Sequence, residues 1–452
     1  MSPQKRQGCF WFGLRWTLRG AIALAVVLAL AFVVVFRSAL YDRFYLFPRE
    51  AKAWTQIQAE RVEPTLDDGW NEYRGVLHAH TLLSHDSAAT QPEIIQALKK
   101  DKVDFICMTD HYQDGKADYS LGWNGVYDGI LFIRGYELGH GLMPWGIPEG
   151  TVFQASDEPR ALAKRIHELG AVLFYSHTEH DRMWDLPELD GMEIYNIHTD
   201  FLDENIRDLA PAIVLCLRAY PEQSMRLIFD PPKGQLTRWD DLNKTRHITG
   251  IAANDTHQNV GIRAFYTPRD TILVQGTGEK TEIISEYKLN FLTRALARLL
   301  LGPLKPDRQI LRVELDPYER SCHYVNTHVL VKACTEKDIV ESLRAGRAFV
   351  AFNMLADAKG FTCFIEGSGK KAVMGESIPF APGLQLKGVS PNQCRFLILK
   401  DGQVVNQSEG SSLLWEVTKP GKYRVQVDLS ILGEWTPWIY ANPIEVLPGS
   451  AV

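Results

Sequence analysis

The sequence has no closely spaced cysteine pair and no strong excess of charge of either sign. Its seven cysteines are scattered over 452 residues without a CxxC or zinc-ribbon spacing, which argues against a cysteine-based zinc site. The formal net charge of −6 is mild and argues against a general nucleic-acid binder. The segment GSGKKA near Gly367 lacks the GxxxxGK[ST] spacing of a phosphate-binding loop, so it indicates no nucleotide site.

The four cysteines in the last third of the chain leave two interpretations open. In an oxidising compartment they allow one or two disulfides, whose connectivity the sequence does not define. The alternative, buried free thiols, is at least as well supported. The residues concerned are Cys322, Cys334, Cys363 and Cys394.

The length of the chain predicts two or three domains. Apolar residues make up 45% and charged residues 23%, as in ordinary globular proteins. Changes of pattern along the chain place the boundaries. The predicted segments are a short cytoplasmic N-terminus (1–19), a transmembrane anchor (20–36), a linker (37–68), an α/β barrel (69–354, with a helical insertion at 277–322) and a β-sandwich (355–452).

Only one apolar run, Gly20–Phe36, is about long enough to cross a bilayer. The nearer cluster of positive charges precedes it, which favours a cytoplasmic N-terminus. A cleaved signal peptide is the alternative, but the run is long and no clear A-x-A site follows. We therefore expect a single-pass protein of the inner or cytoplasmic membrane, with its catalytic domain on the periplasmic or extracellular side.

Seven short apolar runs alternate with helical patterns, which favours a mostly parallel sheet, either open or closed into a barrel. The runs are Gly75–His80, Val103–Thr109, Ile130–Leu138, Ala171–Ser176, Met192–Tyr195, Ile248–Ala253 and Val329–Ala333. Thr90 with Glu93 predicts a capping box, and Gly170 and Gly346 predict two helix ends.

Two regions depart from this alternation. The segment EYKLNFLTRALARLLLG is amphipathic to strongly apolar, and predicts a helix that packs on the barrel or lies on a membrane surface. After residue 355 the pattern is that of strands. Asp401-Gly402 predicts the turn of a hairpin, and the alternation from Lys422 to Leu429 predicts a half-buried strand.

Histidines and carboxylates follow five of the seven runs. His78 and His80 end the first run, and as residues i and i+2 of a strand they are expected to face the same place. Polar groups at the carboxyl ends of barrel strands indicate a functional face, and imidazoles with carboxylates suit divalent transition metals. The other strand-end residues are His111, Glu137, His177, Asp255 and His257.

These motifs resemble those of the polymerase and histidinol phosphatase (PHP) superfamily. GVLHAHTLLSHDS looks like its first motif, and FICMTDH, IRGYELG, FYSH and AANDTH look like the later ones, in order, over about residues 70–350. SLRAGRAFVAF and IYANPIEV resemble the CehA/McbA-type branch, named for carbamate-ester hydrolases. The resemblance implies a distorted seven-stranded (β/α) barrel.

The resemblance also implies a ligand set for two or three divalent ions (zinc, manganese or iron). His78, His80, Glu137 and Asp255 would hold the first ion, and Glu137 would bridge to a second ion held by His177. His111 and His257 would hold a third ion, together with a residue from the tail of the first motif. Family members place Asp at the position of His85 or His at that of Asp86, so both are candidates here, and His85 is favoured.

The implied activity is hydrolysis by a hydroxide that bridges two of the ions, with Glu137, Asp255 and His257 as the candidate catalytic residues. Asp255 or His257 would protonate the leaving group. Arg263 and His180 are candidates for binding a small ester or phosphoester substrate. A membrane-anchored phosphoesterase is the leading hypothesis, a carboxylic or carbamate esterase the second, and an inactive surface protein that binds a glycan or partner the third. No nucleic-acid partner is expected.

Overall fold

The structure is a computed structural model, which describes residues 3–113, 123–154, 157–202, 204–276, 283–314 and 316–449. The chain divides into two compact units. The first consists of Met1–Gln56 and Asp200–Asp230, and the second of Ile57–Thr199 and Pro231–Val452.

The first unit is helical, and its helices reach into the segment that was predicted to be a polar linker. Phe47 and Trp54, seven residues apart on α3, are both buried, so this helix has an apolar face that the sequence analysis overlooked. Glu50 on the same helix pairs with Arg226 at 2.9 Å. The helices are α1 (Pro3–Val35), α2 (Arg37–Tyr41), the π-helix η1 (Asp42–Leu46), α3 (Phe47–Ala59), α7 (Ile206–Cys216) and α8 (Pro221–Arg226).

The predicted anchor lies within α1. Among the described residues, no single helix is both long and apolar enough to cross a membrane. The helical stretches Arg19–Val35 and Arg37–Ala59, which meet at an angle of 81°, satisfy the length and composition criteria only as a pair.

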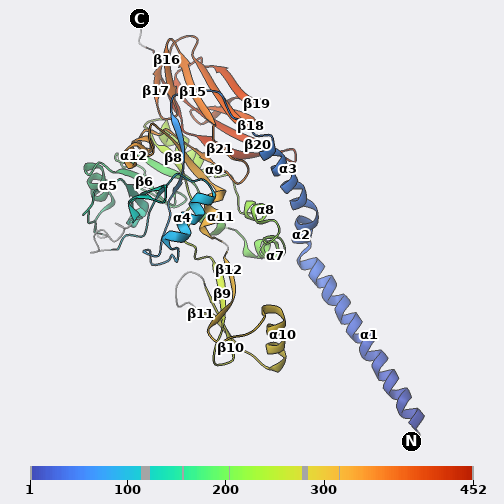
Figure 1. Ribbon diagram of the computed structural model, residues 1–452. Coiled ribbons are helices and arrows are strands. Elements are labelled where there is room, and N and C mark those ends of the chain that lie inside the picture. Colours follow the sequence, from blue (N-terminus) through green and yellow to red (C-terminus); the bar gives the residue numbers. More distant parts are fainter. Residues whose placement is uncertain are drawn as a thin grey trace. The chain divides into compact units, whose positions relative to one another are not determined.

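In the second unit, each of the seven predicted runs overlaps a strand, and two of these, β6 and β8, are labelled in Figure 1. Six of the seven strands take part in a barrel-like arrangement, as expected. The seventh, β13, pairs with β1 antiparallel, whereas a mostly parallel sheet was predicted. The seven strands are β1 (Asn71–Leu77), β2 (Phe105–Cys107), β4 (Ile130–Ile133), β6 (Val172–Tyr175), β7 (Gly191–Asn196), β8 (Thr249–Ala253) and β13 (Asn326–Val331).

The strands form a closed circuit through two isolated bridges. β1, β2 and β4 pair in parallel, and so do β6, β7 and β8. Strand β5 (Leu142–Trp145) pairs antiparallel with β6 and is bridged to the end of β4 through Gly135 and Trp145. A parallel bridge between Ala79 and Thr256 joins β8 back to β1. The carboxyl ends of β1, β2, β4, β6 and β8 therefore converge.

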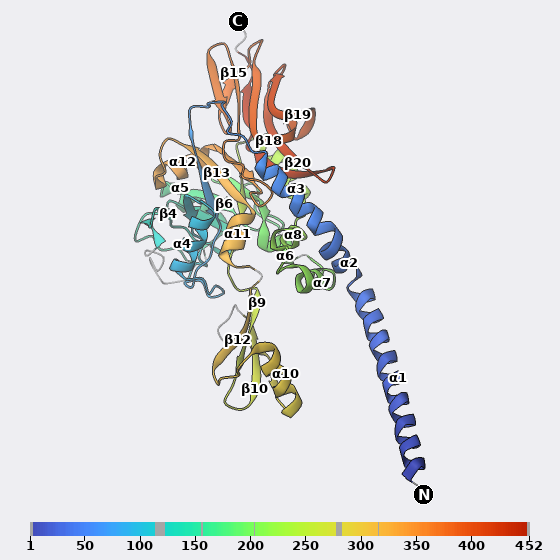
Figure 2. The same cartoon turned by 45° about the vertical axis from the view of Figure 1, so that its right-hand side comes forward.

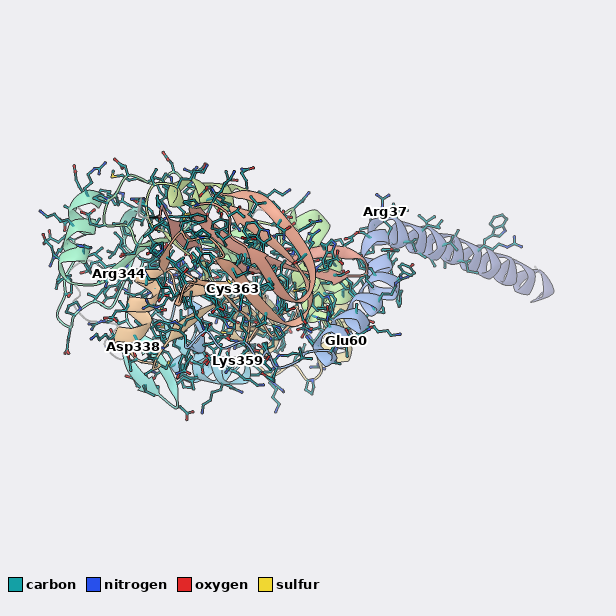
Figure 3. The ribbon with its side chains drawn as sticks, turned by 90° about the horizontal axis from the view of Figure 1, so that it is seen from above. Arg37, Glu60, Asp338, Arg344, Lys359 and Cys363 are labelled. Carbon is teal, nitrogen blue, oxygen red and sulfur yellow. The ribbon has the colours of Figure 1, made fainter. Side chains whose placement is uncertain are left out.

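The circuit encloses a buried apolar cluster, to which six of its strands contribute: Leu77, Phe105, Cys107, Ile133, Trp145, Phe174 and Ile251 are among its members. Helices cover the outside. α4 (Gln91–Lys100) has the predicted Thr90–Glu93 capping box, and α12 (Glu336–Ala345) ends at Gly346 with φ 74°. Asp338 and Arg344 lie near the two ends of α12, where their charges complement the helix dipole (Figure 3).

The remaining elements of this unit include short helices and one edge strand. They are β3 (Gly125–Tyr127), the 3-10 helix η3 (Gly139–Gly141), α5 (Pro159–Glu168), α6 (Ile197–Leu202), α9 (Lys233–Asn243) and α11 (Tyr318–Tyr324). α6 runs across the boundary between the two units.

The C-terminal strands continue the sheet of the circuit. β14 (Ala348–Ala351) pairs with both β13 and β21, so the segment after residue 355 joins one 14-stranded sheet. The predicted hairpin turn is present, with φ of 50° at Asp401 and 81° at Gly402. The strands are β15 (Thr362–Gly367), β16 (Lys370–Val373), β17 (Ser377–Pro379), β18 (Gln385–Lys400), β19 (Gln403–Glu416), β20 (Gly421–Ile431), β21 (Glu434–Ala441) and β22 (Ile444–Leu447).

The insertion predicted to be helical at 277–322 contains the predicted helix but also two strands, and residues 277–282 and 315 lie outside the described part. It contains β11 (Ile283–Lys288), α10 (Phe291–Leu301) and β12 (Arg308–Glu314), which form a four-stranded antiparallel sheet and helix with β9 (Gly261–Tyr266) and β10 (Thr271–Gly276). The predicted helix begins late because Asn290 caps it by accepting a hydrogen bond from the amide of Thr293 at 2.9 Å.

The cysteines whose surroundings are described are free thiols. Five of the six are buried, including Cys363 on β15 (Figure 3). Burial raises the pKa of Cys363, which disfavours the reactive thiolate. Of the two interpretations that the sequence left open, the structure shows free thiols.

Candidate metal centre

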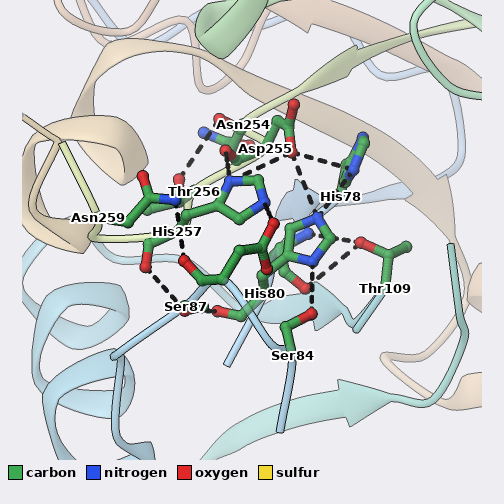
Figure 4. A network of polar contacts seen from close by, with 12 residues as sticks. His78, His80, Ser84, Ser87, Thr109, Asn254, Asp255, Thr256, His257 and Asn259 are labelled. Carbon is green, nitrogen blue, oxygen red and sulfur yellow. Dashed lines mark hydrogen bonds and ion pairs between the residues drawn. The ribbon is translucent and has the colours of Figure 1, made fainter. Parts of the chain in front are cut away.

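The converging strand ends and the loop after β1 bring eight of the nine predicted ligand residues together. His78 follows β1 directly, and its carbonyl accepts a hydrogen bond from the amide of Asp255, just beyond β8, at 2.7 Å. His111 and Glu137 face each other through a parallel bridge. Figure 4 shows His78, His80, Asp255 and His257 gathered at this place.

Three of the predicted ligand residues have a left-handed backbone conformation, which residues other than glycine seldom adopt. The φ angles are 61° at His78, 46° at His177 and 46° at Asp255. Each such residue costs on the order of 1–3 kcal/mol, and such residues cluster at functional sites. The sequence predicted that the pleat of a strand directs the His78 imidazole. His78 instead has a left-handed backbone, so the pleat does not determine the direction of its side chain.

Histidines and carboxylates make three overlapping groups with the geometry to hold a metal ion. Within each group the candidate ligand atoms lie within 4.8 Å of one another. The groups are His78, His80 and Glu137; His78, His177 and Asp255; and His80, Asp86, His111 and His257. Because His78 and His80 belong to two groups each, the three positions form one continuous centre.

Glu137 and Asp255 lie at the middle of this centre, and both are buried. The Oε2 atom of Glu137 is 3.5 Å from His78 Nε2 and 3.3 Å from His111 Nδ1, and its Oε1 is 3.3 Å from His177 Nε2. Asp255 Oδ1 is 3.1 Å from His78 Nε2 and 3.3 Å from His80 Nε2. Each carboxylate therefore faces several imidazoles, as a bridging ligand must.

The outer nitrogens of four imidazoles have polar partners, so their inner nitrogens face the centre. His78 Nδ1 donates to Glu193 at 2.5 Å, and His257 Nδ1 donates to the carbonyl of Asp255 at 3.0 Å. His80 Nδ1 contacts Ser84 Oγ at 3.0 Å, and His177 Nδ1 contacts Glu179 at 3.4 Å. Metal-binding histidines in proteins are held in this way, with Nε2 directed at the ion.

Within the described ranges, several hydrogen-bond acceptors of the centre face one another with no donor between them. Whether cations could satisfy these acceptors tests whether the residues fit a metal. Of the four buried carboxylate oxygens in the described part of the chain that accept no hydrogen bond, three lie in this centre: Asp86 Oδ1, Glu137 Oε2 and Asp255 Oδ1. The Nε2 atoms of His78 and His80 are only 3.1 Å apart. Buried acceptors without a donor are costly, and divalent ions would satisfy them together with the Nε2 lone pairs. The residues present therefore fit the implied metals.

Without metal, protons take the place of the cations. Burial by itself lowers the pKa of His78, but the charges of Asp255, Glu193 and Glu137 raise it well above its ordinary value. For His177, the bonds to Glu137 and Glu179 outweigh burial and raise the pKa to about 10. The neighbouring histidines hold the pKa of Asp255 well below its ordinary range despite burial. The buried carboxylates are therefore ionised, as ligands need to be.

Of the two candidates in the tail of the first motif, the structure places Asp86 in the third group. Asp86 Oδ2 lies 3.1 Å from both His111 Nε2 and His257 Nε2. His85 is exposed and belongs to none of the three groups, and its ring centroid lies 5.0 Å from that of His111. The preference for His85 in the sequence analysis is therefore not supported by this geometry.

Glu193 is the residue that the sequence analysis missed. It lies on β7, is 1% exposed, and accepts hydrogen bonds from His78 Nδ1, from the amide of His177 at 2.8 Å and from Asn196 at 3.0 Å. It thus positions one residue from each of two strand ends. The signal available in the sequence was an acidic residue in the middle of an apolar run, MEIYN.

Replacing Glu193 by Gln is expected to weaken metal binding about 10- to 100-fold, the usual cost of losing a carboxylate that orients a histidine ligand. Gln keeps the shape but no longer accepts strongly from His78. The check is competition with a fluorescent zinc chelator, with Glu168→Gln on the exposed surface of α5 as the control. Equal affinities for both variants would remove this role.

Two further buried carboxylates support the loops around the centre. Asp110 accepts hydrogen bonds from the amide and hydroxyl of Thr81, and burial raises its pKa to about 6. Asp316 accepts from the amides of Asn259 and Val260, and burial raises its pKa to about 6 as well. Both carboxylates hold backbone amides that lie close to candidate ligands in the sequence, but neither belongs to one of the three ligand groups.

The two predicted substrate-binding residues lie apart from the three groups. His180 is 68% exposed on its side chain and lies 3.7 Å from Glu179. Arg263 lies on β9, opposite Gln275 and Arg312, with its guanidinium over the ring of Phe265. His198, half-buried, comes nearer, with its ring 5.1 Å from that of His257.

The fold and the centre define a mixed α/β protein with a cluster of histidines and carboxylates suited to divalent metals. No family model and no curated protein matches the chain. Among solved structures, it is similar to a two-domain protein containing a predicted PHP-like metal-dependent phosphoesterase from Bacteroides vulgatus ATCC 8482, with 13% identity and a TM-score of 0.36, over 85% of this chain and 98% of that chain. A likeness of this degree assigns neither fold nor activity to this chain.

Proposed function

We propose that the protein is a metal-dependent hydrolase that acts on phosphoesters. The observation that carries this proposal is the set of three overlapping ligand groups, in which buried carboxylates face several imidazoles. The proposed ligands are His78, His80, Asp86, His111, Glu137, His177, Asp255 and His257. The order of motifs that resembles the PHP superfamily supports the same activity.

The metals, when bound, would activate water and offset negative charge on the attacked group. Glu137 and Asp255 hold the middle of the centre, while Glu193 and Ser84 fix the orientation of His78 and His80. Asp255 and His257 are the two candidates for the group that protonates the leaving group, and both are also proposed ligands.

To test this activity, the full-length protein is loaded with metal and its turnover of four kinds of ester is compared. The substrates are p-nitrophenyl phosphate, bis-p-nitrophenyl phosphate, and naphthyl acetate and carbamate esters. Phosphoester turnover that disappears with chelator and returns with metal is expected. Turnover of only the carboxylic or carbamate esters would replace this proposal by the second hypothesis. Bound metal without turnover of any ester would favour a binding protein.

We also propose that residues 20–36 anchor the protein in the cytoplasmic membrane, with the hydrolase unit outside. The support is the uncharged run and the positive residues that precede it. An alkaline phosphatase fusion after residue 60 is expected to be active, since that enzyme works only outside the cytoplasm. An inactive but full-length fusion would reverse the topology.

A further inference from the structure

The sheet of β9–β12 and helix α10 form a lobe of their own, made of residues 261–276 and 283–314 (Figures 1 and 2). Among its residues whose burial is described, the buried apolar ones are Ala264, Leu289 and Ala297. Other apolar side chains of the lobe are exposed to solvent.

The exposed apolar side chains of the lobe are concentrated in one short segment. Phe291, the first residue of α10, is 86% exposed, and Ile283, Ile284 and Tyr287 on β11 are 59%, 54% and 59% exposed. β11 is the edge strand of its sheet and is exposed along most of its length. Large apolar side chains gathered on an edge and an adjoining helix end mark an interaction site.

The charge of the lobe indicates the partner. Residues 261–314 carry nine lysines and arginines against six acidic residues, a net charge of +3, although the whole chain carries −6. Lys288 and Arg298 are exposed next to the apolar segment. Arg298 follows Phe291 by seven residues and so lies on the same face of α10. Aromatic and aliphatic side chains flanked by basic ones are typical of surfaces that bind anionic membranes.

We propose that this lobe docks on an anionic lipid bilayer. Phe291, Tyr287 and Ile284 enter the interface, while Lys288 and Arg298 contact headgroup phosphates. The inference does not depend on the metal centre, because none of the candidate ligands lies in the lobe. It is also separable from the proposed anchor, because the two surfaces belong to different units of the chain.

The experiment is hydrogen exchange on the full-length protein with vesicles of phosphatidylcholine and phosphatidylglycerol, and with vesicles of phosphatidylcholine alone. A membrane-inserted α1 would hold the protein on both kinds of vesicle, so local exchange reports the lobe alone. The amides of Ile283–Lys288 and Phe291–Leu301 are expected to exchange about tenfold more slowly on the anionic vesicles, because docking buries apolar and basic groups together.

The variant Ile284→Glu/Phe291→Glu is expected to lose this slowing, because charge replaces the inserted side chains. The control is Val404→Glu, at a residue 57% exposed on β19, which is expected to retain it. Since all three residues are exposed, unchanged thermal unfolding midpoints check the fold. Exchange that is unaffected by anionic vesicles, or equally slowed in the double variant, would overturn the proposal. The proposal would also be overturned if exchange of these amides slowed without lipid as the protein concentration rises. That result would assign the surface to contact with a second copy of the chain.

Discussion

Replacing Glu137 by Gln is expected to remove bound metal and to lower phosphoester turnover by on the order of a thousandfold, because several kcal/mol of transition-state stabilisation depend on the ions. Glu137 is 8% exposed, and its two oxygens face His78, His111 and His177, which belong to all three ligand groups. Gln preserves the volume but lacks the charge that balances a cation. The measurement is metal content and turnover on the same preparation.

The matched control is Glu168→Gln, the same chemical change on the exposed surface of α5. Its metal content and turnover are expected to equal those of the wild type. Wild-type metal content in Glu137→Gln would contradict the bridging position proposed for Glu137. Retained metal with lost turnover would assign Glu137 a role in the reaction and not in binding.

The second large effect is expected at Asp86. Asp86→Ala is expected to lose one metal equivalent and on the order of a hundredfold in turnover, because it removes a proposed ligand of the third ion. Asp86 is the one carboxylate within 3.1 Å of both His111 Nε2 and His257 Nε2 among the described residues. His85→Ala is expected to keep all the metal, because that side chain points to solvent.

These two neighbouring substitutions discriminate between the candidates of the first motif. Elemental analysis of both variants, purified under identical conditions, is the measurement. Loss of metal in His85→Ala and not in Asp86→Ala would reverse the assignment. Equal metal contents in the two variants would leave the third group without support as a metal site.

The strand positions and most of the centre were predictable because they depend on local pattern. The seven apolar runs coincide with strands, and the histidines and carboxylates that follow five of them mark where those strands leave the core. The predicted helix ends at Gly170 and Gly346 are present, with φ of 78° and 74°. Both helices end in a left-handed residue, a conformation that glycine adopts freely.

What could not be predicted depends on contacts between distant segments. Glu193 and His78 are 115 residues apart, and nothing local to either residue specifies their bond. The choice between His85 and Asp86 is decided by where His111 and His257 lie, not by the motif. The strands of the lobe were missed because the strongly apolar sequence of α10 suggested that the whole segment was helical.

The most direct test of the metal centre is the metal stoichiometry of the full-length protein, by elemental analysis after reconstitution with zinc, manganese or iron and removal of excess ion. Two or three equivalents per chain are predicted, with no more than a trace in a variant in which both His78 and Asp255 are replaced by Ala. Fewer than one equivalent under all three conditions, in a protein that remains folded, would contradict the proposed centre.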